Sequence, residues 1–148
     1  ANEIGDDKSK YWSIGFNEVL LKPFKQEDLY NLLVEFSINR KVNLKNKLLT
    51  ASHGDFGFAE TLRSIFIEDS LLRIVSMKTA AIEARHYEVE MIAHNMKSAI
   101  RQLAPQELVE LVKALEVEKF DSSTLLAKVQ TFELRILMFI DELKNVTL

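Results

Sequence analysis

The sequence predicts an all-α fold, specifically an antiparallel four-helix bundle, on three observations. The 148 residues include only 4 glycines and 2 prolines, a composition that favours long helices over turn-rich β architecture. Hydrophobic residues make up 47% of the chain, which is enough for the core of an ordinary domain. From Phe56 to the end, apolar residues recur at helical spacing in segments separated by short loops. Four or five such segments pack best as an antiparallel bundle.

The residue pattern of the N-terminal segment, 1–36, predicts a helix, a short strand and a second helix. The apolar run Val19–Leu21 is ended by Pro23, as is typical of a buried strand. The second helix, at residues 26–36, has acids in its first turn and apolar residues at helical spacing, namely Leu29, Leu32, Leu33 and Phe36. The polar, basic stretch after it predicts a linker, so we place a domain boundary near residue 40, between segments 1–40 and 41–148.

The bundle segments follow in order. Residues 44–49 predict a short helix that is stopped by Gly54, and Asp55 is positioned to cap the next helix. That helix is predicted with an apolar stripe that includes Phe58, Leu62, Ile65, Phe66, Leu72, Val75, Thr79 and Ile82. The third has Val89, Ile92, Met96, Ala99 and Leu103. Pro105 opens a helix with Leu108, Leu111, Val112 and Leu115. The last, capped near residues 121–123, has Leu125, Val129, Phe132, Ile136, Phe139, Ile140 and Leu143.

Composition excludes several classes of function. The formal net charge is −3 with acids and bases interspersed, so no nucleic-acid partner is expected. The chain has no cysteine, which excludes disulfides and thiolate metal sites. No apolar run approaches the roughly 20 residues of a membrane span, and no signal peptide is recognised. We therefore expect a cytoplasmic module without membrane contact of its own.

His94 stands out because it lies on the polar side of an amphipathic helix. At about 100° per residue, His94 falls about 160° from Met96, the centre of the apolar stripe. Ser98 and Arg101 share its outer face. Burial of this histidine in the core is therefore not expected, and two interpretations remain: an ordinary solvated residue, or an accessible nucleophile.

The residues around His94 suit attack on a phosphate. An imidazole has a substantial neutral, nucleophilic fraction near pH 7. Lys97, one turn on, can place an ammonium beside an incoming phosphoryl group, and Ser98 is small enough to let a partner approach. Such a spacing also arises often by chance. The other histidines, His53 and His86, share no face with His94 at ligand spacing, so no metal site is predicted.

The same residues resemble a histidine-containing phosphotransfer (HPt) domain. The motif "AHNMKS" at 93–98 is similar to the family signature, with a helix of the "F-x-x-D…L…A" kind before it and a helix ending in Leu115 and Glu116 after it. The resemblance covers residues 44–144. It implies that His94 is the phosphoacceptor, that Lys97 stabilises the phosphate and that Glu116 is a candidate for orienting the inner ring nitrogen.

The N-terminal stretch "GFNEVLLKPFKQEDL" resembles the end of a response-regulator receiver domain. Lys22 and Pro23 match the Lys-Pro pair that follows the last strand of that family. Residues 1–36 would correspond to its last third only, without the phosphoacceptor aspartate. The chain thus resembles a piece of a hybrid sensor histidine kinase, the cytoplasmic portion of a membrane-anchored protein.

The resemblance implies a relay without ATP-dependent kinase activity. No nucleotide motif is present, so no cofactor is expected, and Mg²⁺ would belong to the partner only. The partners would be response-regulator receiver domains, docking at Met91 and Arg101 beside the histidine. The alternative is a catalytically silent helical scaffold or dimerisation module. A homodimer through the N-terminal strand is a further expectation, because that strand lacks neighbours within the segment.

Overall fold

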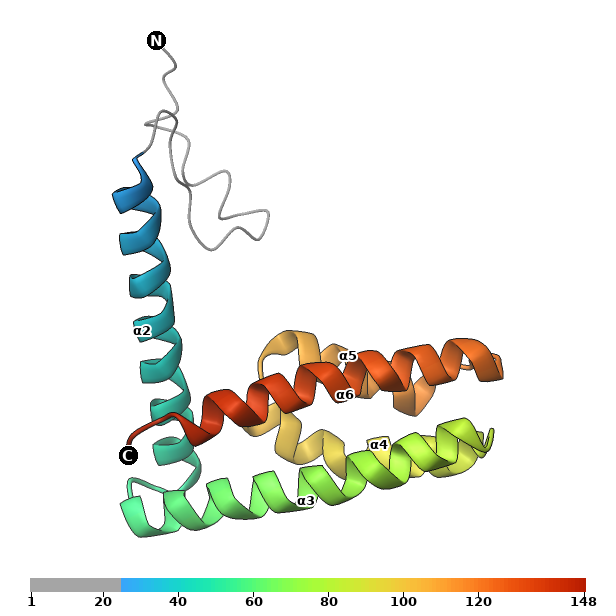
Figure 1. Cartoon of the computed structure of the whole chain (residues 1–148). Coiled ribbons are helices and arrows are strands. Elements are labelled where there is room, and N and C mark those ends of the chain that lie inside the picture. Colours follow the sequence, from blue (N-terminus) through green and yellow to red (C-terminus); the bar gives the residue numbers. More distant parts are fainter. Residues whose placement is uncertain (1–24) are drawn as a thin grey trace. The chain divides into compact units, whose positions relative to one another are not determined.

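The computed structural model describes residues 25–148, all of whose regular structure is helical (Figure 1). Neither the predicted strand at Val19–Leu21 nor Lys22 and Pro23 falls within the described residues. The helices are α2 (Gln26–Ala51), α3 (Phe56–Ile82), α4 (His86–Leu103), α5 (Gln106–Val117) and α6 (Ser122–Lys144). The chain divides into two units, Ala1–Arg40 and Lys41–Leu148, and the division falls within α2.

Helix α2 is one continuous helix where the sequence predicted two helices, at 26–36 and 44–49, joined by a linker. The sequence interpretation placed a linker after residue 36, but the helix runs without interruption to Ala51. The physical reason is that no glycine or proline occurs within it, and the lysine, arginine and asparagine side chains of the supposed linker are tolerated in a helix. The helix ends at Ala51, and the predicted stop, Gly54, lies in the turn that follows, where its φ of 81° suits a left-handed conformation and its N–H donates to Leu49 O at 2.7 Å.

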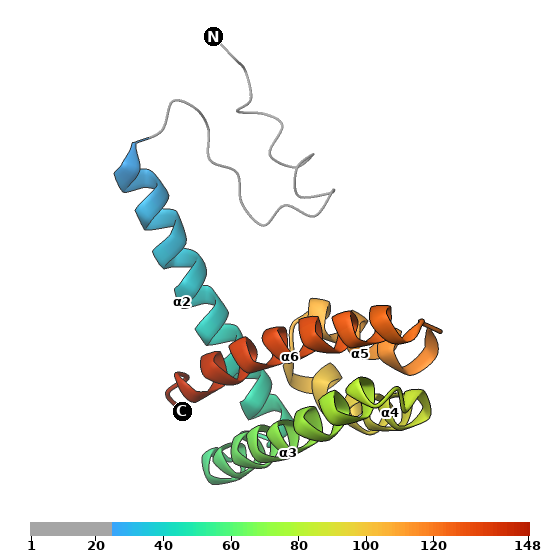
Figure 2. The same ribbon diagram turned by 45° about the vertical axis from the view of Figure 1, so that its right-hand side comes forward.

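Helices α3 to α6 form a helical bundle within the second unit, which confirms the predicted all-α class. Helix α3 packs against α4 and α6, and α5 packs against the same two helices (Figures 1 and 2). The core between them is closed by large side chains; Phe66 of α3 and Phe139 of α6 meet edge to face with ring centroids 5.8 Å apart. This packing fixes which side of each helix remains available to solvent.

The predicted helix starts are confirmed at two positions. The Asp55 carboxylate accepts a hydrogen bond from Phe58 N at 2.8 Å, and the Asp121 carboxylate accepts one from Thr124 N at the same distance. The predicted stripe of α6 is also confirmed, because all seven of its apolar residues are buried. Pro105 immediately precedes α5 rather than opening it.

The predicted stripe of α3 is wrong over most of its length: Phe58 and Ile65 are exposed in its first half, where Phe66 is the only stripe residue that is fully buried, and the second half is exposed as well. Leu72, Val75 and Ile82 are 72%, 65% and 62% exposed, whereas the buried side includes Ile74 and Met77. Helix α3 is apolar on both sides, and its small buried residues, Ala59, Ser70, Ala80 and Ala81, gave a weaker signal than the bulky outer ones. Bulk was therefore a poor guide to burial here.

None of the helices within residues 25–148 is long and apolar enough to cross a membrane.

Candidate functional site

His94 is presented to solvent by the two-sided character of α4. The opposite side of the helix is buried through Val89, Ala93, Met96, Ile100 and Leu103. The His94 side chain keeps 59% of its surface exposed. The helical phase derived from the sequence therefore gives the correct orientation for this residue, although Ala99, assigned to the apolar stripe, is exposed as well.

The last turn of α5 supplies the partner of the His94 ring. His94 Nδ1 lies 2.7 Å from Glu116 Oε1, across the junction of α4 and α5. Glu116 is mostly shielded, with 15% of its side chain exposed, because Leu115 and Val112 anchor that face of α5 in the core. The carboxylate is therefore held in place by packing and can in turn hold the imidazole.

Lys97 completes a three-residue cluster around the same carboxylate. Lys97 Nζ donates to Glu116 Oε1 at 2.8 Å and to Oε2 at 2.6 Å. Since Oε1 also contacts His94, the ammonium lies within two hydrogen-bond lengths of Nδ1. The lysine thus lies beside the ring but is paired with Glu116 rather than free in solution.

The charge state of Glu116 decides the tautomer of the histidine. Hydrogen bonds from His94 and then from Lys97 lower the pKa of the Glu116 carboxyl below its ordinary value. An ionised carboxylate only accepts hydrogen bonds, so the Nδ1 atom of His94 must carry the proton that it shares with Glu116. In the neutral ring the lone pair then lies on Nε2, which no group within residues 25–148 hydrogen-bonds.

The remaining predicted site residues lie around this cluster. Ser98 and Arg101 are exposed on the following turns of α4, and Met91 is 41% exposed one turn before the histidine. Sequence reasoning missed Tyr87, which is 71% exposed and precedes His94 by two turns on the same side. Its seven-residue spacing from His94 is the signal that could have identified it.

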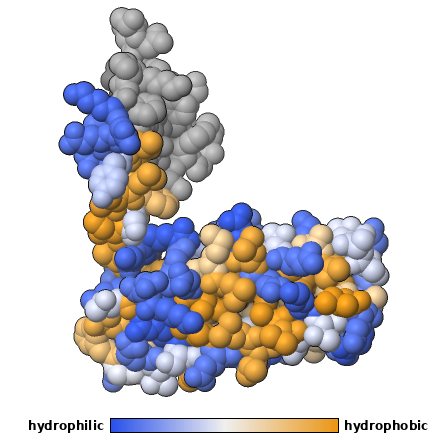
Figure 3. Space-filling model, viewed as in Figure 1, coloured by the Kyte–Doolittle hydropathy of each residue, from blue (hydrophilic) through white to orange (hydrophobic). Residues whose placement is uncertain are grey.

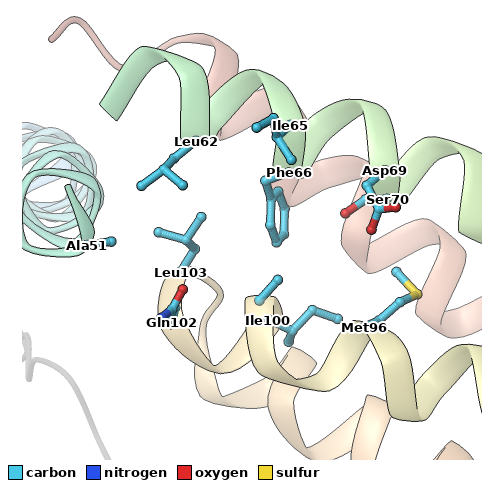
Figure 4. A pocket seen from close by; sticks show the side chains of 11 residues that line it. Ala51, Leu62, Ile65, Phe66, Asp69, Ser70, Met96, Ile100, Gln102 and Leu103 are labelled. Carbon is cyan, nitrogen blue, oxygen red and sulfur yellow. The ribbon is translucent and has the colours of Figure 1, made fainter. Parts of the chain in front are cut away.

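Other features of the described chain offer less chemistry. His86 Nε2 lies 3.2 Å from Ser122 Oγ, a contact that ties the start of α4 to α6. No three metal-ligating side chains among residues 25–148 come together. A pocket of about 120 Å³ between α3 and α4 is mainly apolar, lined by residues such as Leu62, Phe66, Met96, Ile100 and Leu103 (Figure 4). It contains none of the cluster residues.

Comparisons with protein-family models, with curated proteins and with solved structures found no match. A functional assignment therefore rests on the chemistry of the His94 cluster and on the resemblance of its motif.

Proposed function

We propose that this chain is an HPt-type phosphorelay intermediate that accepts a phosphoryl group from a receiver aspartate onto His94 and passes it to another receiver. The observation that carries the proposal is the exposed imidazole of His94 with its Nδ1 held by Glu116. This arrangement leaves the outer nitrogen as the nucleophile and fixes its direction.

The transfer is balanced without any further reactant. Nε2 attacks the phosphorus of the aspartyl phosphate, the new N–P bond forms and the bond from phosphorus to the aspartate oxygen breaks. The aspartate leaves as a carboxylate. The imidazole ring, still protonated at Nδ1, becomes cationic, and the anionic Glu116 beside it offsets that charge. Reversal of the same step delivers the group to a second receiver.

Lys97 has a double role in this proposal. Its ammonium neutralises Glu116 in the resting state and lies on the side of α4 from which a phosphoryl group approaches. Catalysis in phosphoryl transfer is mainly positioning and charge neutralisation, so one cation beside the ring is an appropriate contribution. Mg²⁺ would be held by the receiver partner, which supplies the acidic residues for it.

Docking would use the exposed side of α4 around the histidine. Tyr87 and Met91 offer apolar contact, Ser98 leaves space close to the ring, and Arg101 adds a positive charge at the far end. Apolar side chains beside a reactive polar group are the usual composition of a transient docking surface.

The wider architecture follows from the resemblance alone. Residues 1–36, with Lys22 and Pro23, would be the last part of a receiver domain, and residues 41–148 would be the HPt domain. Together they would belong to the cytoplasmic portion of a hybrid sensor kinase. This proposal concerns the origin of the chain and is independent of the chemistry at His94.

A silent scaffold is the second candidate, and one observation favours it. Helix α3 exposes large apolar side chains away from the His94 cluster, as a module that works through association would. The two candidates differ in whether His94 reacts.

The experiment is phosphoryl transfer from a purified receiver domain that has been charged with radiolabelled acetyl phosphate. The wild-type chain should acquire an acid-labile, base-stable label, and His94→Gln should remove the label while the helical circular dichroism is retained. His86→Gln is the matched control, since it changes another histidine of α4 and should keep the label. Equal labelling of wild type and His94→Gln would show that another residue accepts the phosphate. An unlabelled wild type with several receivers would support the scaffold.

A further inference from the structure

Helix α3 carries a second apolar side that the bundle does not cover. Its buried side faces α4 and α6, whereas the opposite side exposes Leu72, Val75 and Ile82 as well as Ile65, which is 57% exposed. In the space-filling view apolar surface lies over α3 and α6 on the face of the bundle toward the viewer (Figure 3). In a monomeric protein, the exposed side of a surface helix normally presents polar residues to water.

The exposed residues of α3 follow the spacing of a helix-pairing seam. Six positions alternate by three and four residues; we call them the outer seam: Ile65, Glu68, Leu72, Val75, Thr79 and Ile82. A repeat of seven residues keeps one stripe facing a partner helix along its length. The inner side of the same helix does not use these positions, so the seam is available without unfolding the bundle.

We propose that the outer seam pairs with the outer seam of a second copy of this chain in an antiparallel homodimer. The partner helix must have the same period and an apolar stripe of the same length, and α3 itself meets both requirements. An antiparallel pairing matches Ile65 with the partner's Ile82 and Leu72 with the partner's Val75. By two-fold symmetry each of these contacts occurs twice.

The polar seam residues select this direction of pairing. Antiparallel alignment sets Glu68 opposite the partner's Thr79, whose hydroxyl donates to Val75 O in the isolated chain at 3.1 Å and can turn toward the carboxylate. Parallel alignment would instead set Glu68 against the partner's Glu68, two like charges in direct contact. A polar residue within an otherwise apolar seam is a common device for fixing register.

The residues that flank the seam are compatible with the antiparallel register. Asp69, already paired with Arg73 at 2.7 Å, would lie beside the partner's Ser76. Lys78 would extend its aliphatic stem over the partner's Leu71 and keep its ammonium near Glu133 of its own α6. No like charges oppose one another in this register.

The His94 cluster shares no residue with the outer seam. His94, Lys97 and Glu116 belong to α4 and α5, and none of the outer-seam residues contributes to their contacts. Association and phosphoryl transfer should therefore be separable by substitution.

The first test measures the mass of the full 148-residue chain by sedimentation equilibrium over a concentration series. The wild type should reach twice the 17.0 kDa of one chain, and Leu72→Glu with Val75→Glu should return it to one chain without loss of helical circular dichroism. Tyr87→Glu is the matched control, because Tyr87 is equally exposed but lies on α4, and it should remain dimeric. A monomeric wild type, or a dimer that survives the double substitution, would overturn the proposal.

The second test determines direction by cross-linking. The chain contains no cysteine, so a single introduced cysteine is the only one that can form a disulfide in each chain. A mixture of Ile65→Cys and Ile82→Cys chains, one of them tagged, should form mixed disulfides. Ile65→Cys alone should not, because its two copies would lie about 25 Å apart along the helix pair, whereas a disulfide requires Cα atoms within about 7 Å. Efficient self-linking of Ile65→Cys would instead show a parallel pair and refute the antiparallel register.

Discussion

Helices α3 and α4 pack against each other, yet their exposed sides differ in chemistry. Helix α4 divides cleanly into a buried apolar side and an outer side whose middle carries His94, Lys97 and Ser98. Helix α3 is apolar on both sides, with Ile74 inside and Leu72 outside. The same bundle thus contains one helix with a polar exposed side that carries a histidine and one helix with an apolar exposed side.

The difference shows how two kinds of exposed surface can be kept apart in a small bundle. On α4, the exposed histidine has a fixed partner, because α5 places Glu116 beside its ring. On α3, the exposed apolar side chains recur at a regular spacing within the helix itself. Because the two surfaces lie on different helices, a change in one need not alter the other.

The largest effect is expected on the inner side of α3. Ile74→Ala removes a side chain that is 5% exposed and should lower the free energy of unfolding by about 2–5 kcal/mol, since a cavity remains. Leu72→Ala, two residues earlier and 72% exposed, should change it by less than about 0.5 kcal/mol. Urea unfolding followed by circular dichroism measures both.

The comparison must be made at protein concentrations low enough to keep the chain monomeric, because dimer formation would make the measured stability depend on protein concentration. A large loss of stability for Leu72→Ala in the dilute sample would mean that the outer side of α3 is covered within one chain, which would refute the two-sided description of this helix.

Sequence periodicity predicted the buried sides of α4 and α6 well but not the buried side of α3, and the difference depends on whether a helix is apolar on one side or on both. Where apolar residues occupy only one side, as around Met96, the period fixes the buried side and the exposed side together. Where both sides are apolar, as at Ile74 and Leu72, the period predicts a helix but not which side is inside. The decision then depends on the neighbouring helices, and no single segment contains that information.

The candidate site was predictable in its parts but not in its connections. The exposure of His94 follows from the phase of α4 within the chain. Its contact with Glu116 was suggested by the family resemblance, but helical periodicity alone does not give it, because it depends on how α5 returns along α4 after the short turn at Pro105. The pairing of Lys97 with that same carboxylate depends on it as well, and it changes the environment predicted for the lysine.

A smaller effect is expected on the outer side of α4, from Lys97. If its ammonium stabilises the transferring phosphoryl group, Lys97→Ala should slow labelling of His94 by roughly 10- to 100-fold without abolishing it, as a charge-assisted contact worth about 1–3 kcal/mol would. Lys78→Ala is the matched control, because Lys78 also pairs with a glutamate of a neighbouring helix but lies on α3. Rapid-quench labelling measures the rates. Unchanged transfer in Lys97→Ala would leave the lysine a structural partner of Glu116 only.

The smallest effect is expected in the titration of Glu116, which tests whether α5 holds the outer side of α4 electrostatically. The pKa of this carboxyl should lie below its ordinary range, and both His94→Ala and Lys97→Met should raise it toward that range, because each removes a hydrogen bond that lowers it. Carbon-detected NMR of the Glu116 side-chain carboxyl measures its pKa in the wild type and in both variants.

Since the pKa of Glu116 is lower in the folded state than in the unfolded state, the contribution of the cluster to stability is complete above the ordinary carboxyl range. It is lost as the pH falls through the folded-state value. The stability difference between the wild type and His94→Ala should therefore shrink toward acid pH. A Glu116 carboxyl that titrates in its ordinary range in all three proteins would show that its contacts with His94 and Lys97 are not maintained in solution, and the fixed tautomer on which the proposed chemistry depends would lose its basis.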